Sequence, residues 1–247
     1  MTSLRFTSRV PVFDSNIGVG HRHDRPSPVQ NTEGLLEEMH RHGIERALIY
    51  HVQGESISGI DGNEALTTWD HESLTFQWVA GATSDSLLQL QEFHSSGKVN
   101  SIRLHNTVDC HSPFVDWVYG DLLSWLENEN IPLWISLSDT PVVEIMTTLQ
   151  PFSKLRTVLL GAHYSHSSVI IPLLRALPNS YLELSRYENL GAIESLIAEF
   201  GAGRFLYGSY YPRYAMGPML YYLHHMAIND RELRAICSHN LEQLLRR

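Results

Sequence analysis

The feature that most constrains this chain is a regular alternation of short apolar segments with helix-like segments. Eight apolar segments, rich in β-branched residues, follow one another along the chain: 10–13, 46–51, 76–81, 99–105, 131–137, 156–162, 180–185 and 204–209. Each is short and mostly continuous in apolar residues, as expected of parallel strands that are covered on both faces.

Signals for the ends of helices occur between these segments. We expect one helix to be capped by Thr32 and to end at Gly43, because hydroxyl side chains favour helix N-termini and glycine favours their C-termini. Thr140 is the expected N-cap of another helix, with the following proline in its first turn. Asn229 and Glu232 have the spacing of a capping box.

Eight strand–helix alternations within 247 residues predict a single domain, 1–247, with an α/β fold of the (β/α)8 TIM-barrel type. A doubly wound open sheet is the alternative. It often carries a glycine-rich nucleotide motif, and neither G-x-G-x-x-G nor G-x-x-x-x-G-K-[ST] occurs here. The stretch 52–75 has no clear pattern, and we expect it to form a lid or to contain a short helix.

The charge balance limits the partners that this chain can bind. The formal net charge is −9 and there is no run of Lys or Arg, so we expect no nucleic-acid or membrane partner. No apolar run approaches the ~18 residues of a membrane helix, and the N-terminus lacks the apolar core of a signal peptide. We therefore expect a cytoplasmic protein in which Cys110 and Cys237 are buried thiols.

Polar side chains occur where the predicted strands end. In a barrel the active site lies at the carboxyl-terminal ends of the strands, and residues two apart on a strand share a face. Applying this to each strand gives one set of candidates: Asp14, Asn16, His51, Arg103, His105, Ser136, Ser138, His163, Glu183 and Tyr210. Because so many strand ends contribute polar groups, we predict one shared pocket.

Several motifs, in order along nearly the whole chain, resemble the amidohydrolase-related branch of the amidohydrolase superfamily. They are "LLEEMHRHGIERALIYH" (35–51), "GNEAL" (62–66), "SIRLH" (101–105), "LLGAHYS" (159–165), "FGAGRFLYGSYYP" (200–212) and "SHNLEQLL" (238–245). The resemblance implies a (β/α)8 barrel. In most members it also implies one divalent metal that serves hydrolysis or decarboxylation of small carboxylated substrates.

The metal ligands that this resemblance implies are largely missing. The family pattern has a His-x-His on the first strand, histidines on the fifth and sixth strands, and an aspartate on the eighth. The corresponding positions here hold Asn16, Gly18, Ser136 or Ser138, and Tyr210. Only His163 is retained, whereas such metals usually take three or more imidazole, thiolate or carboxylate ligands. We therefore predict no metal at the family position and no other cofactor.

His21 and His23 leave one alternative open. They stand two residues apart just after the first strand, and in an extended loop both rings would face one way. Together with Asp24 or His163 they would rebuild a metal site, in a metal-dependent hydrolase. Otherwise they belong to a solvated loop.

Without a metal, side chains must activate water. His163 is the expected general base, with His51 and His105 as further catalytic candidates, Tyr210 as a proton or hydrogen-bond donor and Glu183 as an orienting or acid–base group. The expected substrate-binding residues are Arg103, Asn16, Ser136 and Ser138, with Arg103 holding a substrate carboxylate.

The sequence thus favours a metal-independent hydrolase or lyase that acts on a small carboxylate, ester or lactone. The family includes metal-independent members, such as the pyrone-dicarboxylate lactonase, so loss of the metal does not exclude catalysis. The alternative is a non-catalytic barrel that binds a small molecule or a protein. A homodimer is expected only by analogy with the family.

Overall fold

The computed structural model describes residues 6–21 and 26–246. Its strands are β1 Phe13–Val19, β2 Arg46–His51, β3 Leu74–Phe76, β4 Trp78–Ala80, β5 Ile102–Leu104, β6 Leu133–Ser136, β7 Thr157–Leu160, β8 Ser180–Glu183 and β9 Phe205–Leu206. Its α-helices are α1 Thr32–Arg41, α2 Val52–Ser56, α3 Gly59–Leu66, α4 Ser84–Ser95, α5 Asp116–Asn128, α6 Val142–Leu149, α7 Ser167–Ala176, α8 Ala192–Phe200, α9 Gly217–His225, α10 Asp230–Arg234 and α11 Asn240–Leu245. Short 3-10 turns occur at Thr67–Trp69, Tyr164–His166 and Ala202–Arg204, and a π-helical segment occurs at Ala235–His239.

The strands form a closed parallel barrel. β1, β2 and β3 pair in that order, and β4 to β9 pair in chain order. β3 and β4 are two halves of one barrel strand separated by Gln77, the first pairing with β2 and the second with β5. The Ser15 N–H donates to the Tyr207 carbonyl (3.1 Å) and the Gly18 N–H to that of Tyr211 (2.6 Å), which joins the last strand to the first. The predicted (β/α)8 barrel is confirmed, and the open-sheet alternative is wrong.

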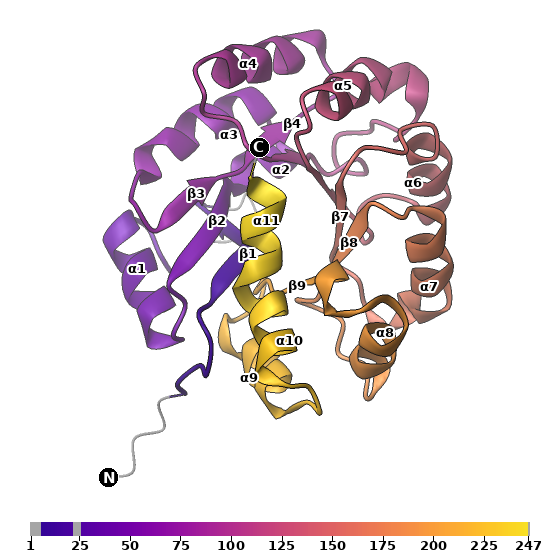
Figure 1. Cartoon of the computed structure of the whole chain (residues 1–247). Helices are drawn as coiled ribbons and strands as arrows, with labels where there is room; N and C mark the ends of the chain where they lie inside the picture. The colour runs from indigo at the N-terminus through magenta and orange to yellow at the C-terminus, as the bar shows by residue number, and fades with distance from the viewer. Residues whose placement is uncertain (1–5, 22–25, 247) are drawn as a thin grey trace.

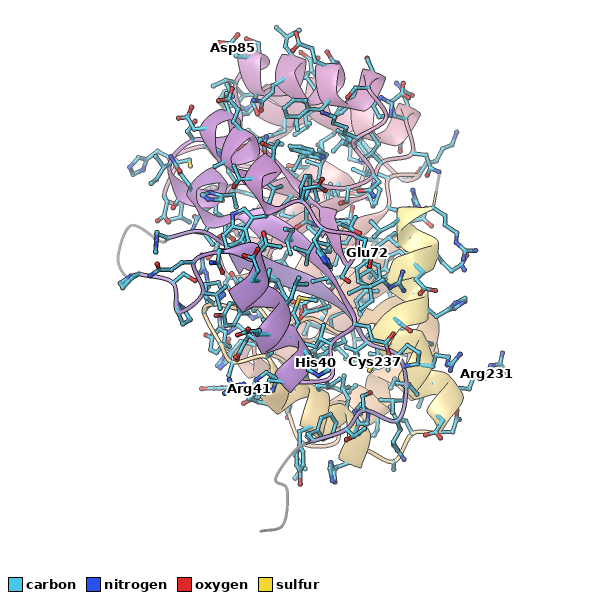
Figure 2. The ribbon with its side chains drawn as sticks, turned by 90° about the vertical axis from the view of Figure 1, so that its left-hand side faces the viewer. His40, Arg41, Glu72, Asp85, Arg231 and Cys237 are labelled. Carbon is cyan, nitrogen blue, oxygen red and sulfur yellow. The ribbon has the colours of Figure 1, made fainter. Side chains whose placement is uncertain are left out.

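Helices surround the barrel, and α11 crosses one of its ends (Figure 1). Figure 2, turned by 90°, shows α11 from the side at that end. Leu241 and Leu244 of this helix belong to a buried cluster with Phe13, Leu48 and Trp134 from the barrel strands. The amino-terminal end of the barrel is therefore closed by apolar packing, which leaves the carboxyl-terminal mouth as the end where polar side chains gather.

The first strand begins later than the sequence indicated. We predicted a strand at 10–13, but β1 runs from Phe13 to Val19 and is buried along its whole length. It contains the polar residues Asp14, Ser15 and Asn16, which hydrogen-bond inside the molecule. A search for continuous apolar runs misses such a strand, because its polar groups are satisfied by partners distant in sequence.

Two of the predicted helix caps are displaced by one residue. Asn31 rather than Thr32 caps α1, with its side chain accepting from the Gly34 N–H at 3.0 Å. Thr140 is not a cap, because α6 begins after the following proline. The capping box at Asn229 and Glu232 is confirmed, with reciprocal bonds of 3.0 Å.

The stretch 52–75, which was expected to form a lid or to contain a short helix, contains the two short helices α2 and α3. The Asn63 side chain donates to the Val79 carbonyl (2.9 Å) and accepts from the Val79 N–H (2.7 Å), so it pairs with β4 as a neighbouring strand would. A Cβ added to Gly62 would lie 2.4 Å from the backbone nitrogen of Gly54, which explains the need for glycine there. The "GNEAL" motif therefore places α2 over the mouth of the barrel.

Both cysteines are free thiols; Cys237 is buried as expected, whereas Cys110 is only partly buried. Across residues 6–21 and 26–246, no helix combines the length and apolar character needed to cross a membrane.

Candidate functional site

The centre of the carboxyl-terminal mouth is a buried arginine on β5. The Arg103 Nε and Nη2 groups donate to Glu55 Oε1, the former at 3.1 Å, and Nη1 donates to Asn16 Oδ1 at 3.1 Å. The Arg103 side chain is only 1% exposed and that of Glu55 only 5%. Two strands and α2 thus meet at one guanidinium group, whose planar fork suits such paired contacts.

A second arginine reaches the same carboxylate from the solvent side. Arg213 Nη2 donates to Glu55 Oε2 at 3.0 Å, and the Arg213 side chain is 25% exposed. Burial alone would raise the pKa of Glu55, but the two guanidinium groups hold it below its ordinary value. Glu55 is therefore a carboxylate at neutral pH.

Two tyrosine rings flank these arginines. The guanidinium carbon of Arg103 lies 3.8 Å from the centroid of the Tyr50 ring, and that of Arg213 lies 5.0 Å from the centroid of the Tyr210 ring. The Tyr210 hydroxyl is buried and has no hydrogen-bond partner among the described residues. Its pKa is well above the ordinary value because of burial and the nearby Glu55 charge. Tyr210 is therefore a neutral hydrogen-bond donor.

The carboxyl group of Glu183, on β8, is buried and is connected to this arginine through Asn16. Glu183 accepts from Asn16 Nδ2 (3.2 Å), from the Ser185 N–H (2.8 Å) and from the Ser185 hydroxyl (2.9 Å). Burial raises the pKa of Glu183 to about 7, with a smaller contribution from the Asp14 charge, because the three hydrogen bonds only partly offset the loss of hydration. Asn16 therefore connects this carboxyl group to Arg103.

Asp14 forms a second buried carboxyl group near the first. Its Oδ1 accepts from the Asn16 N–H (2.9 Å) and the Ser209 N–H (3.0 Å), whereas its Oδ2 has no partner among the described residues. Burial raises the pKa of Asp14 to about 6. Asp14 thus fixes the backbone where β1 meets the segment after β9, and its charge contributes to the raised pKa of Glu183.

The three candidate histidines do not join this network. His163 is partly exposed, and its Nδ1 lies 3.3 Å from the Ser165 hydroxyl. His105 Nε2 is hydrogen-bonded to the hydroxyl of Tyr119 on α5, and burial lowers its pKa to about 4.

His51 packs against the backbone at Gly20, where an added Cβ would lie 2.2 Å from its Nε2. Its pKa is lowered by burial and by the nearby His21.

The two serines after β6 also make their own contacts. The Ser138 hydroxyl donates to the Gly161 carbonyl (2.7 Å) and accepts from Arg186 Nη1 (3.3 Å), while the Ser136 hydroxyl accepts from the Ser138 N–H (3.2 Å). They lie at the end of β6 and in the turn after it, and Ser138 connects this turn to the segment that follows β7. Of the other loop candidates, His21 accepts from the Ser27 N–H (3.2 Å), and His23 lies outside the described residues.

The structure therefore brings Asn16, Arg103, Glu183 and Tyr210 together, and it adds two residues that the sequence reasoning missed. Glu55 was missed because the stretch 52–75 has no strand pattern. An arginine predicted to point into a barrel needs a buried counter-charge, and that need is the signal that would have prompted a search for Glu55. Arg213 was missed because it lies just after the motif 200–212, in which only the tyrosine Tyr210 was considered as a site residue.

The side chains at the positions where the family resemblance implies metal ligands do not fit a divalent metal. The Asn16 amide oxygen already accepts from Arg103, Gly18 has no side chain, and Tyr210 is held in its neutral form. Imidazole, thiolate and carboxylate are the ligands that such cations prefer. In the part of the chain that the structure describes, no group of three or more His, Cys, Asp or Glu side chains is arranged to hold a metal ion.

An open groove of about 1150 Å³ lies at the opposite end of the barrel, away from these residues. Its lining includes Arg9, Ile44 and His71, together with His40 and Arg41 at the end of α1 (Figure 2). None of the candidate site residues lines it.

The whole barrel is similar to several solved structures. An uncharacterised TIM-barrel protein from Bordetella bronchiseptica has a TM-score of 0.74 and 19% identity, covering 96% of this chain and 98% of that one. The 5-carboxyvanillate decarboxylase from Sphingomonas paucimobilis has a TM-score of 0.74 and 12% identity, covering 96% and 99%. A putative 2-pyrone-4,6-dicarboxylic acid hydrolase from Pseudomonas putida has a TM-score of 0.69 and 16% identity, covering 96% and 98%.

This chain has the fold of these proteins. The resemblance indicated by the sequence motifs is confirmed at the level of the fold, because the structures of amidohydrolase-superfamily members match the barrel over nearly its whole length. At these identities the likeness concerns the fold alone. No protein-family model matches the sequence, and no curated protein matches it at a significant level.

Proposed function

We propose that this barrel is a hydrolase or lyase that acts on a small carboxylate, ester or lactone, without a metal at the position that the family uses. The observation that carries the proposal is the Arg103 guanidinium, which is bound to Asn16 at the first-strand position where the family has a metal ligand. A fixed guanidinium supplies positive charge at the mouth and orients a carboxylate through paired hydrogen bonds.

The proposal assigns roles according to how far each group is accessible. Arg213 and His163 are partly exposed and meet the substrate first, the former as the carboxylate-binding group and the latter as general base. Tyr210, which is fully buried, neutral and without a hydrogen-bond partner among the described residues, is the proposed donor for a developing oxyanion. Glu183 is buried and acts through Asn16, which it keeps in position for Arg103.

The remaining sequence candidates have narrower roles in this proposal. Ser136 and Ser138 shape the substrate-facing turn of the rim. His105, with a pKa lowered to about 4, stays neutral at physiological pH and is a hydrogen-bonding group rather than a proton donor. His51 has no partner for its Nδ1 among the described residues and remains a second candidate base beside His21.

Turnover of a library of small carboxylates, esters and lactones tests the reaction, with products detected by mass spectrometry. His163→Gln should lower kcat for the true substrate by at least about 100-fold while the protein stays folded, because a general base contributes about that much. His111→Gln is the matched control, a histidine outside the mouth network, and should leave kcat unchanged. Full activity of the His163→Gln variant would contradict the proposed role.

Elemental analysis tests the metal-free part of the proposal. Protein purified without added metal and without chelator should contain far less than one equivalent of any transition metal, and EDTA should change neither its stability nor its activity. About one equivalent of metal per chain, removed by chelator together with a function, would refute this part and would favour a site that uses His21 and His23.

The burial of the central residues favours a second candidate function. Asn16 and Glu183 are fully buried and Arg103 nearly so, so substrate does not reach them in this conformation. A non-catalytic barrel that binds a small molecule or protein at its rim is consistent with this closure. If compounds of the same library stabilise the protein and none is converted to product, the binding function is supported and the enzymatic function is not.

A further inference from the structure

The carboxylate of Glu55 occupies a site whose construction is that of a ligand-binding site. Arg103 contributes three donor groups to the network, Arg213 approaches from the solvent side, and the Tyr50 and Tyr210 rings flank the two guanidinium groups. Two aromatic rings and two guanidinium groups in this arrangement suit a planar, negatively charged ligand group. The one carboxylate that they bind here comes from a short helix of this chain rather than from a barrel strand.

The Tyr210 hydroxyl is a second, independent observation that points to a ligand. The side chain is fully buried, its hydroxyl has no hydrogen-bond partner among the described residues, and the Glu55 charge is the largest influence on its pKa after burial itself. An unpaired buried hydroxyl costs free energy. A ligand in this site with an acceptor atom that Glu55 does not offer would satisfy that hydroxyl.

Only the side chain of Glu55 has to move for the site to open. Its backbone carbonyl accepts from the Asn106 N–H at 2.6 Å, and a Cβ added to Gly54 would lie only 3.0 Å from Val79 Cγ2, so α2 is held close against the barrel. Rotation about the side-chain bonds of Glu55 releases both arginines without unfolding α2. The exposed edge of Arg213 is the point where a ligand first competes with Glu55 Oε2.

We propose that the space between Arg103 and Arg213 is a carboxylate-binding site that Glu55 fills in this structure, and that a small organic acid binds there in exchange for the Glu55 carboxylate. The inference rests on the proposed function in one respect, since it places the substrate's carboxylate at these arginines. Glu55 then has two roles: it neutralises the arginines and it lowers the apparent affinity of every ligand that must displace it.

Removing the internal competitor tests this inference. In Glu55→Ala, sodium acetate and sodium benzoate should bind at least about tenfold more tightly than in the wild type, measured by calorimetry and by the rise in Tm. Sodium chloride at equal ionic strength controls for screening. Glu64→Ala, which removes an exposed acid from the neighbouring α3, is the matched control and should bind these acids as the wild type does.

A second variant keeps the test decisive if Glu55→Ala folds poorly. Glu55→Gln preserves the shape of the side chain but removes the charge, and it should also bind both acids more tightly than the wild type. Adding Arg213→Gln to either variant should abolish that gain. Equal affinity in the wild type and both Glu55 variants, or a gain that survives Arg213→Gln, would overturn the inference.

These outcomes are distinguishable from failure of the proposed function, because binding is measured without turnover. Binding that depends on Glu55 and Arg213, with no product from any compound, would support the carboxylate site and refute the enzyme. Turnover combined with affinities that do not respond to Glu55 would support the enzyme and overturn the exchange.

Discussion

Glu183→Gln should change how the stability of this protein depends on pH. Burial raises the pKa of the Glu183 carboxyl from 4.5 to about 7. A carboxyl group whose pKa is raised in the folded state contributes most to stability below its unfolded pKa. That contribution is lost as the pH rises through the folded value, because the folded protein then has to hold a buried charge. Between pH 5 and pH 8 the wild type should therefore lose stability at this residue.

The magnitude follows from the two pKa values. Linkage between 4.5 and about 7 gives a loss of roughly 2.5 kcal/mol in the free energy of unfolding from pH 5 to pH 8. For a domain of this size that corresponds to roughly 5 to 10 °C in Tm. Glutamine does not titrate, so the variant should lack this part of the slope. Its amide also places one donor against Asn16 Nδ2, which costs about 1 kcal/mol at every pH and leaves the slope unaffected.

The assay is Tm and urea unfolding at several pH values from 5 to 8, for the wild type, Glu183→Gln and the control Glu64→Gln. Glu64 is exposed, so its variant should follow the wild-type profile. All other titratable groups are shared by the three proteins, so the difference between the wild type and Glu183→Gln reports on Glu183 together with its electrostatic effect on the nearby Asp14. Parallel profiles for the wild type and Glu183→Gln would refute the reasoning that this buried carboxyl group has a raised pKa.

Two further predictions concern hydrogen bonds near the mouth. Asn63→Ala should destabilise the protein by about 2–4 kcal/mol in urea unfolding, because it leaves the buried N–H and carbonyl of Val79 unpaired; no loss would show that water replaces the amide. Tyr210→Phe should leave Tm unchanged or raise it, since no described residue hydrogen-bonds to its hydroxyl, whereas Tyr207→Phe should cost about 1 kcal/mol by losing its 2.7 Å bond to the Met216 carbonyl. The opposite order of the two variants would contradict the hydrogen-bond assignment.

The periodicity of the sequence determined the barrel and the orientation of its strand residues. Alternation along a strand placed Arg103 and Glu183 inside, and both lie there. Glycine after a helical stretch correctly marked the end of a helix at Gly43, which adopts a positive φ. These predictions succeeded because strand pleating and helix termination depend on neighbouring residues, which the sequence displays directly.

The substitutions at the metal positions were also visible without a structure. Asn16 and Tyr210 stand where the family resemblance implies metal ligands, and ligand chemistry alone argues against a divalent cation there. The sequence did not indicate which groups these residues contact. In the structure Asn16 is bound to the Arg103 guanidinium, which also binds Glu55.

Only the tertiary structure decided which polar groups meet. His105 directly follows β5 and Arg103 lies within it, yet the His105 ring is bound by Tyr119, whereas the Arg103 side chain reaches Glu55, 48 residues away. The alternation of residues along a strand predicts on which face of the strand a side chain lies. The partner of that side chain depends on which group from another element lies within hydrogen-bonding distance once the barrel closes. A buried charge needs such a partner, and the partner can come from a distant part of the chain.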